Sequence, residues 1–521
     1  MKSNIYFKYL TLLLFFAGLS ACETEDELRG DIIADSPNPF VPVEVTADAG
    51  SADFSKYVAV GNSLTAGLMD GALYTEGQNN SFPNLLAKQF ALAGGGEFVQ
   101  PDIDTDRGFN VLLNSLSNPS SGNFGRFLLD TSVPAPSPLV PGAPLTPYTG
   151  SAVNNFGVPG ARVVDLNIPQ YGLETGGNYF YFRFASDPGV STIMGDALAA
   201  QGSFHTLWIG SNDVLGWVSG GGVAPDGDVT PGAELNPSAL TGTTNFTAAF
   251  TGTLDALTAG GGKVVVMNIP NILATPLLQA VSYDRIELDQ ATAEQLNTGL
   301  APVNAALGAM TNFGVSQEEI DRRLISYAEG NNPILAIDDS LDDFGPFFDL
   351  LGLPAAQRAA LEPFRQSRPL TANDFVILFS ARDLGTVVNG DPNLLTGISY
   401  PIGDDKIITA DEALKAGIRI ATFNAIIAGA VAADPNAELV DANQIFTDVV
   451  EDFLAQGGYE VGGQKLTPDF SPNGIFSVDA VHPNPRGHGI IANEIIKVIN
   501  EKFGATLPLI DVLNLPGVSI R

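Results

Sequence analysis

The stretch Tyr57-Val58-Ala59-Val60-Gly61-Asn62-Ser63-Leu64 places a short apolar run directly before a glycine turn and a serine. The run has the length and composition of a buried strand. The glycine permits a sharp turn, and a side chain just past a strand end projects from the carboxyl edge of a parallel sheet, where α/β proteins bind their ligands. Ser63 is therefore a candidate nucleophile, and the alternative is a Gly-Asn-Ser turn with no chemical role.

A second strand pattern indicates the class of sheet. Residues 263–269 read Lys-Val-Val-Val-Met-Asn-Ile, a valine-rich run without polar alternation. Such runs fit a parallel sheet that is covered on both faces. Further patterns predict helices at 82–92, 245–258, 285–312, 408–433 and 486–503, and a strand at 437–440. We expect an α/β protein, a three-layer α/β/α sandwich with a mainly parallel central sheet, enlarged by long loop and helical insertions.

A histidine near the C-terminal end is the candidate general base. The chain has only three histidines, and one of them stands in Asp479-Ala480-Val481-His482-Pro483. Imidazole titrates near neutral pH, and a neighbouring carboxylate fixes its tautomer and stabilises its charged form. The pattern therefore predicts His482 as the base and Asp479 as the group that orients it.

Two turns could supply hydrogen-bond donors to a reacting carbonyl oxygen. Residues 155–161 form a glycine-rich turn that includes Gly160, and the strand pattern at 206–209 leads into Gly210-Ser211-Asn212-Asp213. Preorganised donors aimed at a developing oxyanion typically contribute ~3 to 4 kcal/mol each. A glycine N–H and the Asn212 amide suit that task, although each turn taken singly also fits ordinary loop chemistry.

In the order serine, glycine, asparagine and Asp-x-x-His, these segments resemble the SGNH hydrolases, also called the GDSL esterase/lipase family. The resemblance implies an SGNH/flavodoxin-like fold with Ser63 as nucleophile, His482 as general acid and base, and Asp479 as its partner. It also implies an oxyanion hole made by the N–H groups of Ser63 and Gly160 and by the amide of Asn212.

One position departs from the family pattern. The first block reads Gly61-Asn62-Ser63-Leu64, with Asn62 where the family name expects aspartate. That residue is not one of the four that carry the chemistry in the family. The departure therefore bears on hydrogen bonding within the turn more than on activity.

The N-terminal end is typical of an export signal. Residues 1–21 contain a basic start, an apolar run from Tyr9 to Leu19 and small residues before Cys22, the only cysteine. The apolar run is too short to span a membrane. The segment resembles a bacterial lipoprotein signal peptide, which implies cleavage before Cys22 and lipidation of that residue. An ordinary secretory signal with an incidental cysteine is the alternative.

Residues 22–50 are predicted to form a tether. Residues 23–27 contain four acids, and the following stretch is rich in Pro, Ala, Ser and Asp without a clear period. Such composition is typical of a solvated, disordered segment. An acidic patch at this position also resembles an address for display on the outer face of the outer membrane. We expect a lipid-anchored protein of the bacterial outer membrane. It could lie on the periplasmic face or on the external face, and the sequence does not decide between them.

The charge balance excludes several classes of partner. Removal of residues 1–21 takes away two lysines and no acids, so 25 basic residues become 23 beside 58 acidic ones, a formal net charge of −35. A surface this acidic repels phosphate backbones and anionic headgroups. We therefore expect no nucleic acid partner and a neutral ester substrate, either a lipid or an acylated glycan. The protein is expected to be a monomer that meets the membrane through its lipid anchor.

The spacing of the four blocks indicates insertions in the predicted hydrolase domain, residues 51–521. Ser63 and Gly160 are 97 residues apart, and Asn212 and Asp479 are 267 residues apart. A strand and helix of a parallel sheet need only ~30 residues. We expect insertions near 95–150, 218–241 and 318–400. The first two are either the rim of the substrate pocket or surface loops, and the aromatic run at 344–348 is either a cap on an acyl site or a small packed subcore.

These patterns predict a serine esterase or lipase that cleaves carboxylic esters through an acyl-enzyme. The alternatives are a carbohydrate O-acetyl esterase and a non-catalytic, glycan-binding surface lipoprotein. No cofactor and no catalytic metal are expected, because no group of His, Asp and Glu has the spacing of zinc ligands. The acidic stretch 338–343 lacks the glycine and the terminal Glu of a calcium-binding hand loop, and a structural calcium is left open.

Overall fold

The computed structural model describes residues 47–116, 118–130, 132 and 135–521, which belong to one compact unit, Ala47–Arg521. The predicted signal peptide, Cys22 and the acidic part of the predicted tether lie outside the described residues. The expected lipid anchor and location in the outer membrane therefore stay predictions.

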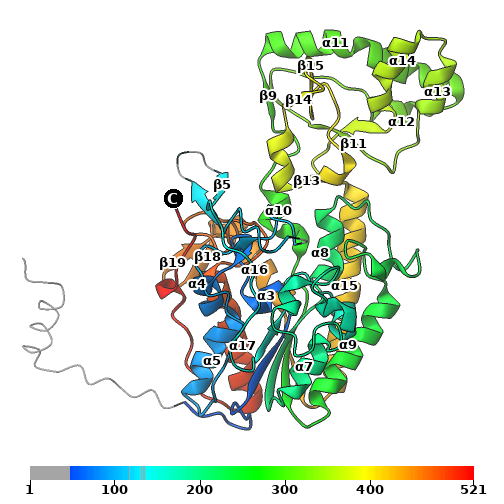
Figure 1. The fold of residues 1–521 in the computed structure, drawn as a ribbon. Helices are drawn as coiled ribbons and strands as arrows, with labels where there is room; N and C mark the ends of the chain where they lie inside the picture. The colour runs from blue at the N-terminus through cyan, green and yellow to red at the C-terminus, as the bar shows by residue number, and fades with distance from the viewer. Residues whose placement is uncertain (1–46, 117, 131, 133–134) are drawn as a thin grey trace, which may run out of the picture. The chain divides into compact units, whose positions relative to one another are not determined.

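The centre of the described chain is a sheet of five parallel strands in the order β17-β8-β7-β1-β6. The strands are β1 (Tyr57–Gly61), β6 (Asn155–Gly157), β7 (Phe204–Trp208), β8 (Lys263–Met267) and β17 (Ala437–Val440). Helices connect the strands (Figure 1). The predicted α/β class and the parallel central sheet are confirmed.

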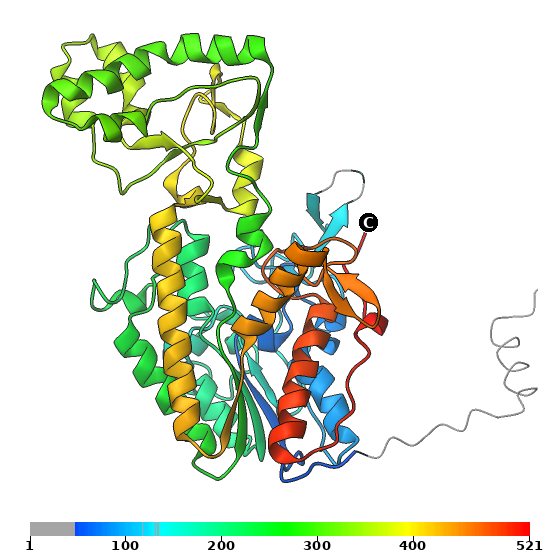
Figure 2. The same cartoon turned by 180° about the vertical axis from the view of Figure 1, so that it is seen from behind.

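Successive residues of the strands face two different apolar clusters, as the two-residue period of a strand requires. Val58, Val60, Leu207, Val264 and Val266 join a cluster with α7 (Ile193–Ala199), α9 (Thr243–Thr258) and α15 (Ala410–Ala433). Ala59, Phe204, Trp208, Val265 and Met267 join a cluster with α5 (Phe82–Ala91) and α17 (Pro485–Phe503). Figures 1 and 2 show these helices beside the strands. Full burial of each such side chain contributes about 1.5–3 kcal/mol.

The main helices begin and end close to the predicted residues because their sequences carry local start and stop signals. Thr409 and Glu412 form a capping box at the start of α15. The side chain of Asn484 accepts the Gly487 N–H at the start of α17, and Gly504 ends that helix with a φ of 68°. These signals act within one turn of helix, so they can be read without tertiary information.

A lobe, defined here as residues 281–408, is inserted between β8 and α15 and has apolar clusters of its own. Its main helices are α11 (Gln290–Gly308), α12 (Gln317–Asp321), α13 (Gly345–Leu350) and α14 (Ala355–Leu361). Its strand pairs are β9 (Ile286–Leu288) with β10 (Gly330–Asn332), β11 (Leu335–Ile337) with β12 (Ser367–Pro369), β13 (Phe375–Val376) with β16 (Ile407–Ile408), and β14 (Val387–Val388) with β15 (Asp391–Leu395). The helix predicted at 285–312 forms as α11, but it packs inside the lobe on buried Phe344 and Phe348. The aromatic run is therefore a packed subcore.

The remaining α-helices and strands of the described chain lie outside the lobe. They are α3 (Ser63–Ala66), α4 (Thr75–Asn79), α6 (Tyr179–Phe182), α8 (Asn212–Ser219), α10 (Pro276–Gln279), α16 (Ala442–Gln456), β2 (Ala72–Leu73), β3 (Phe109–Asn110), β4 (Phe127–Asp130), β5 (Ala135–Pro138), β18 (Tyr459–Val461) and β19 (Gln464–Leu466). Of these, α3, α8 and α16 follow β1, β7 and β17 at the carboxyl edge of the sheet.

α15 is long and apolar enough to cross a membrane by length and composition alone. Its buried side chains instead pack against α9, where the rings of Phe423 and Phe246 stack with centroids 3.7 Å apart. Both rings are fully buried. This contact stabilises α15 as a helix of the core, because burial of each ring removes a large apolar area from water.

We expect Phe423→Ala to lower the free energy of unfolding by about 3–5 kcal/mol, since it leaves a cavity beside Phe246. Urea unfolding followed by circular dichroism measures the change. The matched control is Leu414→Ala on the same helix, where the side chain is 63% exposed and the expected change is within about 0.5 kcal/mol. Equal midpoints for the two variants would contradict the described packing of α15.

Candidate active site

The order of the strands brings three of the four sequence blocks to one edge of the sheet. β1 lies between β6 and β7, so the residues that follow these three strands are neighbours. Ser63 begins α3 directly after β1, and Asn212 begins α8 after β7. Gly160 follows β6 by three residues. The carboxyl edge of a parallel sheet is therefore the common location of these candidates.

The turn that presents Ser63 needs glycine at the ends of two neighbouring strands, Gly61 on β1 and Gly157 on β6. A Cβ at Gly61 would collide with the carbonyl oxygen of Trp208, and a Cβ at Gly157 would collide with the backbone N of Ala66. α3 can therefore begin tightly against the sheet. Asn62 caps this helix, because its Oδ1 accepts the Leu64 N–H at 3.0 Å. An amide thus provides the turn hydrogen bond at the position where the family pattern has aspartate.

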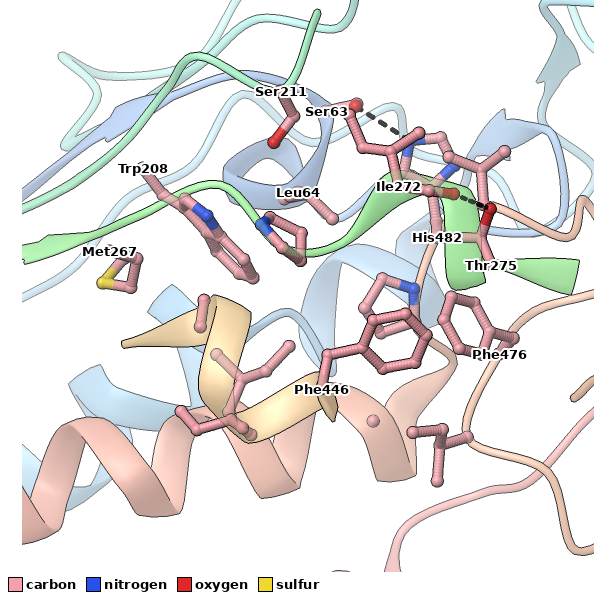
Figure 3. A pocket seen from close by; sticks show the side chains of 18 of the residues that line it. Ser63, Leu64, Trp208, Ser211, Met267, Ile272, Thr275, Phe446, Phe476 and His482 are labelled. Carbon is pink, nitrogen blue, oxygen red and sulfur yellow. Dashed lines mark hydrogen bonds between the residues drawn. The ribbon is translucent and has the colours of Figure 1, made fainter. Parts of the chain in front are cut away.

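Ser63, His482 and Asp479 form a continuous hydrogen-bonded series. His482 Nε2 lies 2.8 Å from Ser63 Oγ, and His482 Nδ1 lies 3.0 Å from Asp479 Oδ2; Figure 3 shows the bond to Ser63. A carboxylate only accepts, so it places the ring proton on Nδ1 and leaves Nε2 as acceptor for the serine proton. The structure thus brings together these three predicted residues, which lie 419 positions apart at the extremes.

Asp479 is buried but well supplied with donors. Its Oδ2 also accepts the Gly71 N–H at 2.8 Å, and its Oδ1 accepts the N–H groups of Val481 and His482 at 3.0 and 2.9 Å. Burial alone raises the pKa of Asp479, but the charge and hydrogen bonds of His482 and the Gly71 N–H outweigh burial and lower the pKa to about 2. The carboxylate is therefore ionised at neutral pH.

Asp70 and Ser477 hold the loop of Asp479, and sequence reasoning missed both. Asp70 N–H donates to Ser477 Oγ at 3.0 Å, Val478 N–H donates to Asp70 Oδ1 at 3.2 Å, and Tyr74 OH donates to Asp70 Oδ2 at 2.7 Å. Burial, opposed by the Tyr74 bond and helped by the charge of Asp479, raises the pKa of Asp70 to about 6. The Asp-Gly pair at 70–71 is a recognisable turn signal, but nothing local connects it to residue 477.

Of the three predicted oxyanion donors, Ser63 and Asn212 line a cavity together with His482, and Gly160 does not. Among the described residues, the N–H groups of Ser63 and Gly160 donate no hydrogen bond. Asn212 Nδ2 donates to Ala161 O at 2.9 Å, which leaves its second amide hydrogen for another partner. Asn212 lines the same cavity as Ser63 and His482. Gly160 is exposed, has a φ of 82° and is not among the residues that line this cavity.

Asp213, which sequence reasoning did not assign, joins the start of α8 to the loop after Gly160. Its Oδ2 accepts the Val163 N–H at 2.8 Å, and the residue is fully buried. Burial raises the pKa of Asp213 to about 7. This bond holds the start of α8 beside the same loop whose Ala161 O accepts from the Asn212 amide.

Two cavities meet at His482. The first has an empty volume of about 950 Å³, which includes its opening to solvent, and contains Ser63, Ser211 and Asn212 among mainly apolar side chains. The second has an empty volume of about 990 Å³. Leu215, Val481 and His482 line both. The C-terminal part of the lobe contributes polar side chains to the second cavity: Ser380, Arg382, Asp383, Asp405 and Lys406.

One group of carboxylates in the described part of the chain has the spacing of a metal site. The ligand atoms of Asp339, Asp404 and Glu412 lie within 4.8 Å of one another. Burial, together with the charges of Asp339 and Glu412, raises the pKa of Asp404 to about 7. None of the three lines the two cavities that meet at His482.

The other two histidines are structural. Burial lowers the pKa of His205 to about 4, and burial with the nearby charge of His482 lowers that of His488 to about 3. His488 Nδ1 accepts the Phe82 N–H at 3.2 Å, at the start of α5.

Comparisons of the chain with protein-family models, with curated proteins and with solved structures gave no match. The geometry brings together groups that acyl transfer can use. A serine hydroxyl, an imidazole and an asparagine amide line one cavity, and an ionised carboxylate is hydrogen-bonded to the imidazole.

We expect Asp213 to contribute less to the free energy of unfolding as the pH rises from about 4 to about 7. The folded state keeps the proton on this carboxyl while the unfolded state releases it near its ordinary pKa, so ionisation favours unfolding in that window. Asp213→Asn removes this dependence.

The measurement is urea unfolding of both proteins at pH 4.5 and 8. The stability of Asp213→Asn relative to the native protein should be higher at pH 8 than at pH 4.5. Asp255→Asn, at an exposed position on α9, should keep the native dependence. A difference between Asp213→Asn and the native protein that does not change with pH would show that Asp213 does not titrate as described.

Proposed function

We propose that this protein is a serine esterase of the SGNH hydrolase type, with a three-layer α/β/α sandwich as its scaffold. The observation that carries the proposal is the hydrogen-bonded series Ser63–His482–Asp479, at 2.8 and 3.0 Å, in which Ser63 and His482 line a cavity together with Asn212. A non-catalytic binding protein would have no need for a buried carboxylate that orients an imidazole toward a serine.

In the first half of the reaction, Ser63 Oγ attacks the ester carbonyl carbon while His482 Nε2 takes the serine proton. Asp479 stabilises the imidazolium through Nδ1. Negative charge builds on the carbonyl oxygen, and the N–H groups of Ser63 and Gly160 and the free hydrogen of Asn212 are the available donors. His482 then gives its proton to the leaving alcohol, and the carbon–oxygen bond of the ester breaks.

In the second half, water repeats the attack on the acyl-enzyme. His482 takes a proton from water, the hydroxide forms the new bond to the acyl carbon, and Ser63 leaves with the proton returned by His482. The products are a carboxylic acid and free enzyme. Each step uses groups of this chain, and the proposed substrate is a neutral ester. The proposed lipid on Cys22 would attach the enzyme to the membrane.

We expect Ser63→Ala to lose hydrolysis of p-nitrophenyl butyrate and labelling by a fluorophosphonate probe, because both need the activated serine oxygen. The matched control is Ser211→Ala. Ser211 lines the same cavity, but its buried hydroxyl has no hydrogen-bond partner among the described residues. Labelling that persists in Ser63→Ala and disappears in Ser211→Ala would overturn the assignment of the nucleophile.

We expect Asn212→Ala to lower kcat by ~10² to 10³ with little change in KM, because an oxyanion donor acts mainly in the transition state. Steady-state kinetics with the same ester measures this effect. The control is Asn500→Ala on α17, where the amide also donates to a backbone carbonyl, Leu507 O at 2.9 Å, away from the cavity. An unchanged kcat in Asn212→Ala would exclude this amide from the oxyanion hole.

A further inference from the structure

The cavity beside Ser63 is lined by residues of two apolar clusters, and Ile445, which also lines it, packs against both. One cluster belongs to the sheet and contributes Trp208, Met267, Val440 and Ala442. The other covers α16 and α17 and contributes Phe446, Val449, Ile475, Phe476 and Ile490. Protein interiors are close-packed, so space left empty between two such clusters forfeits contacts on every side. The apolar walls of such a cavity favour an apolar molecule over water.

The polar side chains of this cavity gather at the reacting serine. They are Asn62, Ser63, Ser211, Asn212, Thr275 and His482. Figure 3 shows Ser63 and His482 on one side of the pocket and the rings of Phe446 and Phe476 across from them. These two rings pack edge to face with centroids 5.3 Å apart. A molecule that starts at Ser63 and extends into the cavity therefore leaves polar surroundings and enters apolar ones.

The acyl half of an ester fits this cavity better than the alcohol half. The first cavity contains Ser63 and Asn212, which must reach the carbonyl carbon and oxygen. The second cavity contains His482, which protonates the leaving alcohol, but it does not contain Ser63. Its lining mixes apolar side chains such as Leu277 and Ile377 with charged ones, among them Arg382, Asp383 and Lys406, so it suits a hydrated alcohol better than the first cavity does.

We propose that the substrate is an ester whose acyl group is a hydrocarbon chain considerably longer than acetyl, and that this chain inserts between α16 and α17. Phe446 on α16 is the residue that limits its length. The proposal rests on the proposed esterase function and names its substrate class. An acetyl group would leave the apolar cavity empty, so the alternative of a glycan O-acetyl esterase is disfavoured.

Two substrate series test which half of the ester enters the cavity. With p-nitrophenyl esters from acetate to laurate, kcat/KM should rise about fourfold per methylene until the cavity is full, the factor that corresponds to ~0.8 kcal/mol per buried methylene. With alkyl acetates from methyl to octyl, kcat/KM should stay nearly constant. A flat acyl series, or a gain confined to the alkyl acetates, would overturn the proposal.

Variants of Phe446 test where the chain lies. Phe446→Trp should lower kcat/KM for the longest good substrate by about tenfold and leave the acetate ester nearly unchanged, because a larger ring shortens the cavity. Phe446→Ala should move the optimum to longer chains. Leu454→Trp, on the same helix with a side chain 77% exposed, is the control and should match the native protein. Acetate hydrolysis near the native rate verifies that each variant is folded.

The same preference in Leu454→Trp and in both Phe446 variants would place the chain elsewhere and overturn the assignment. If Phe446→Trp does not fold, Phe446→Ala carries the test alone, since the shift to longer chains has no other expected cause.

A binding measurement separates this inference from the proposed function. Ser63→Ala should bind decanoate, detected by displacement of a fluorescent fatty acid, and Phe446→Trp combined with Ser63→Ala should weaken that binding. Phe446-dependent binding without hydrolysis of any ester by the native protein would refute the esterase and leave the acyl cavity supported. Ser63-dependent hydrolysis of acetate without chain preference or decanoate binding would refute the acyl cavity alone.

Discussion

The contact between the loop after α3 and the loop before α17 is the constraint on which the site depends. Asp70 N–H donates to Ser477 Oγ, Val478 N–H donates to Asp70 Oδ1, and Gly71 N–H donates to Asp479 Oδ2, across more than 400 residues of chain. Without these bonds the buried Asp479 would lack part of its compensation, and a buried carboxylate without donors is costly. With them, the loop is held so that His482 Nε2 meets the hydroxyl of Ser63.

The buried carboxyls around the site differ in protonation because their donors differ. Asp479 accepts bonds from three N–H groups and from the His482 ring, which outweigh its burial and lower its pKa to about 2. Burial dominates for Asp70 and Asp213, whose pKa values rise to about 6 and about 7. Near pH 5 negative charge is therefore concentrated on the carboxyl that faces the imidazole, and Asp70 and Asp213 ionise only as the pH rises through about 6 and about 7. In the proposed acyl transfer, the ionised Asp479 would stabilise the imidazolium of His482.

In the proposed complex, the core surrounds the acyl half of the substrate and the inserted lobe lies beside the alcohol half. Helices α16 and α17, with the strand ends of the sheet, surround the apolar cavity that contains Ser63. The lobe contributes charged side chains to the second cavity on the other side of His482, whose lining is otherwise largely apolar. A long insertion costs little closure entropy, so it can reshape one half of a site while the sheet keeps the reacting groups in place. On this view acyl preference is set by the core and alcohol preference by the lobe.

The sequence by itself determined the features that depend on neighbouring residues: the buried strand before Ser63, the parallel sheet, the helices near α5, α9, α15 and α17, and the four blocks of candidate residues. Hydrophobic periodicity, glycine turns and helix caps act over a few residues, so they can be read directly. Only the tertiary structure decided that α11 belongs to a lobe of residues 281–408, that Asp70 and Ser477 hold the loop of Asp479, and that an apolar cavity lies between α16 and α17. These features depend on contacts between segments hundreds of residues apart, and no local pattern specifies which segments will meet.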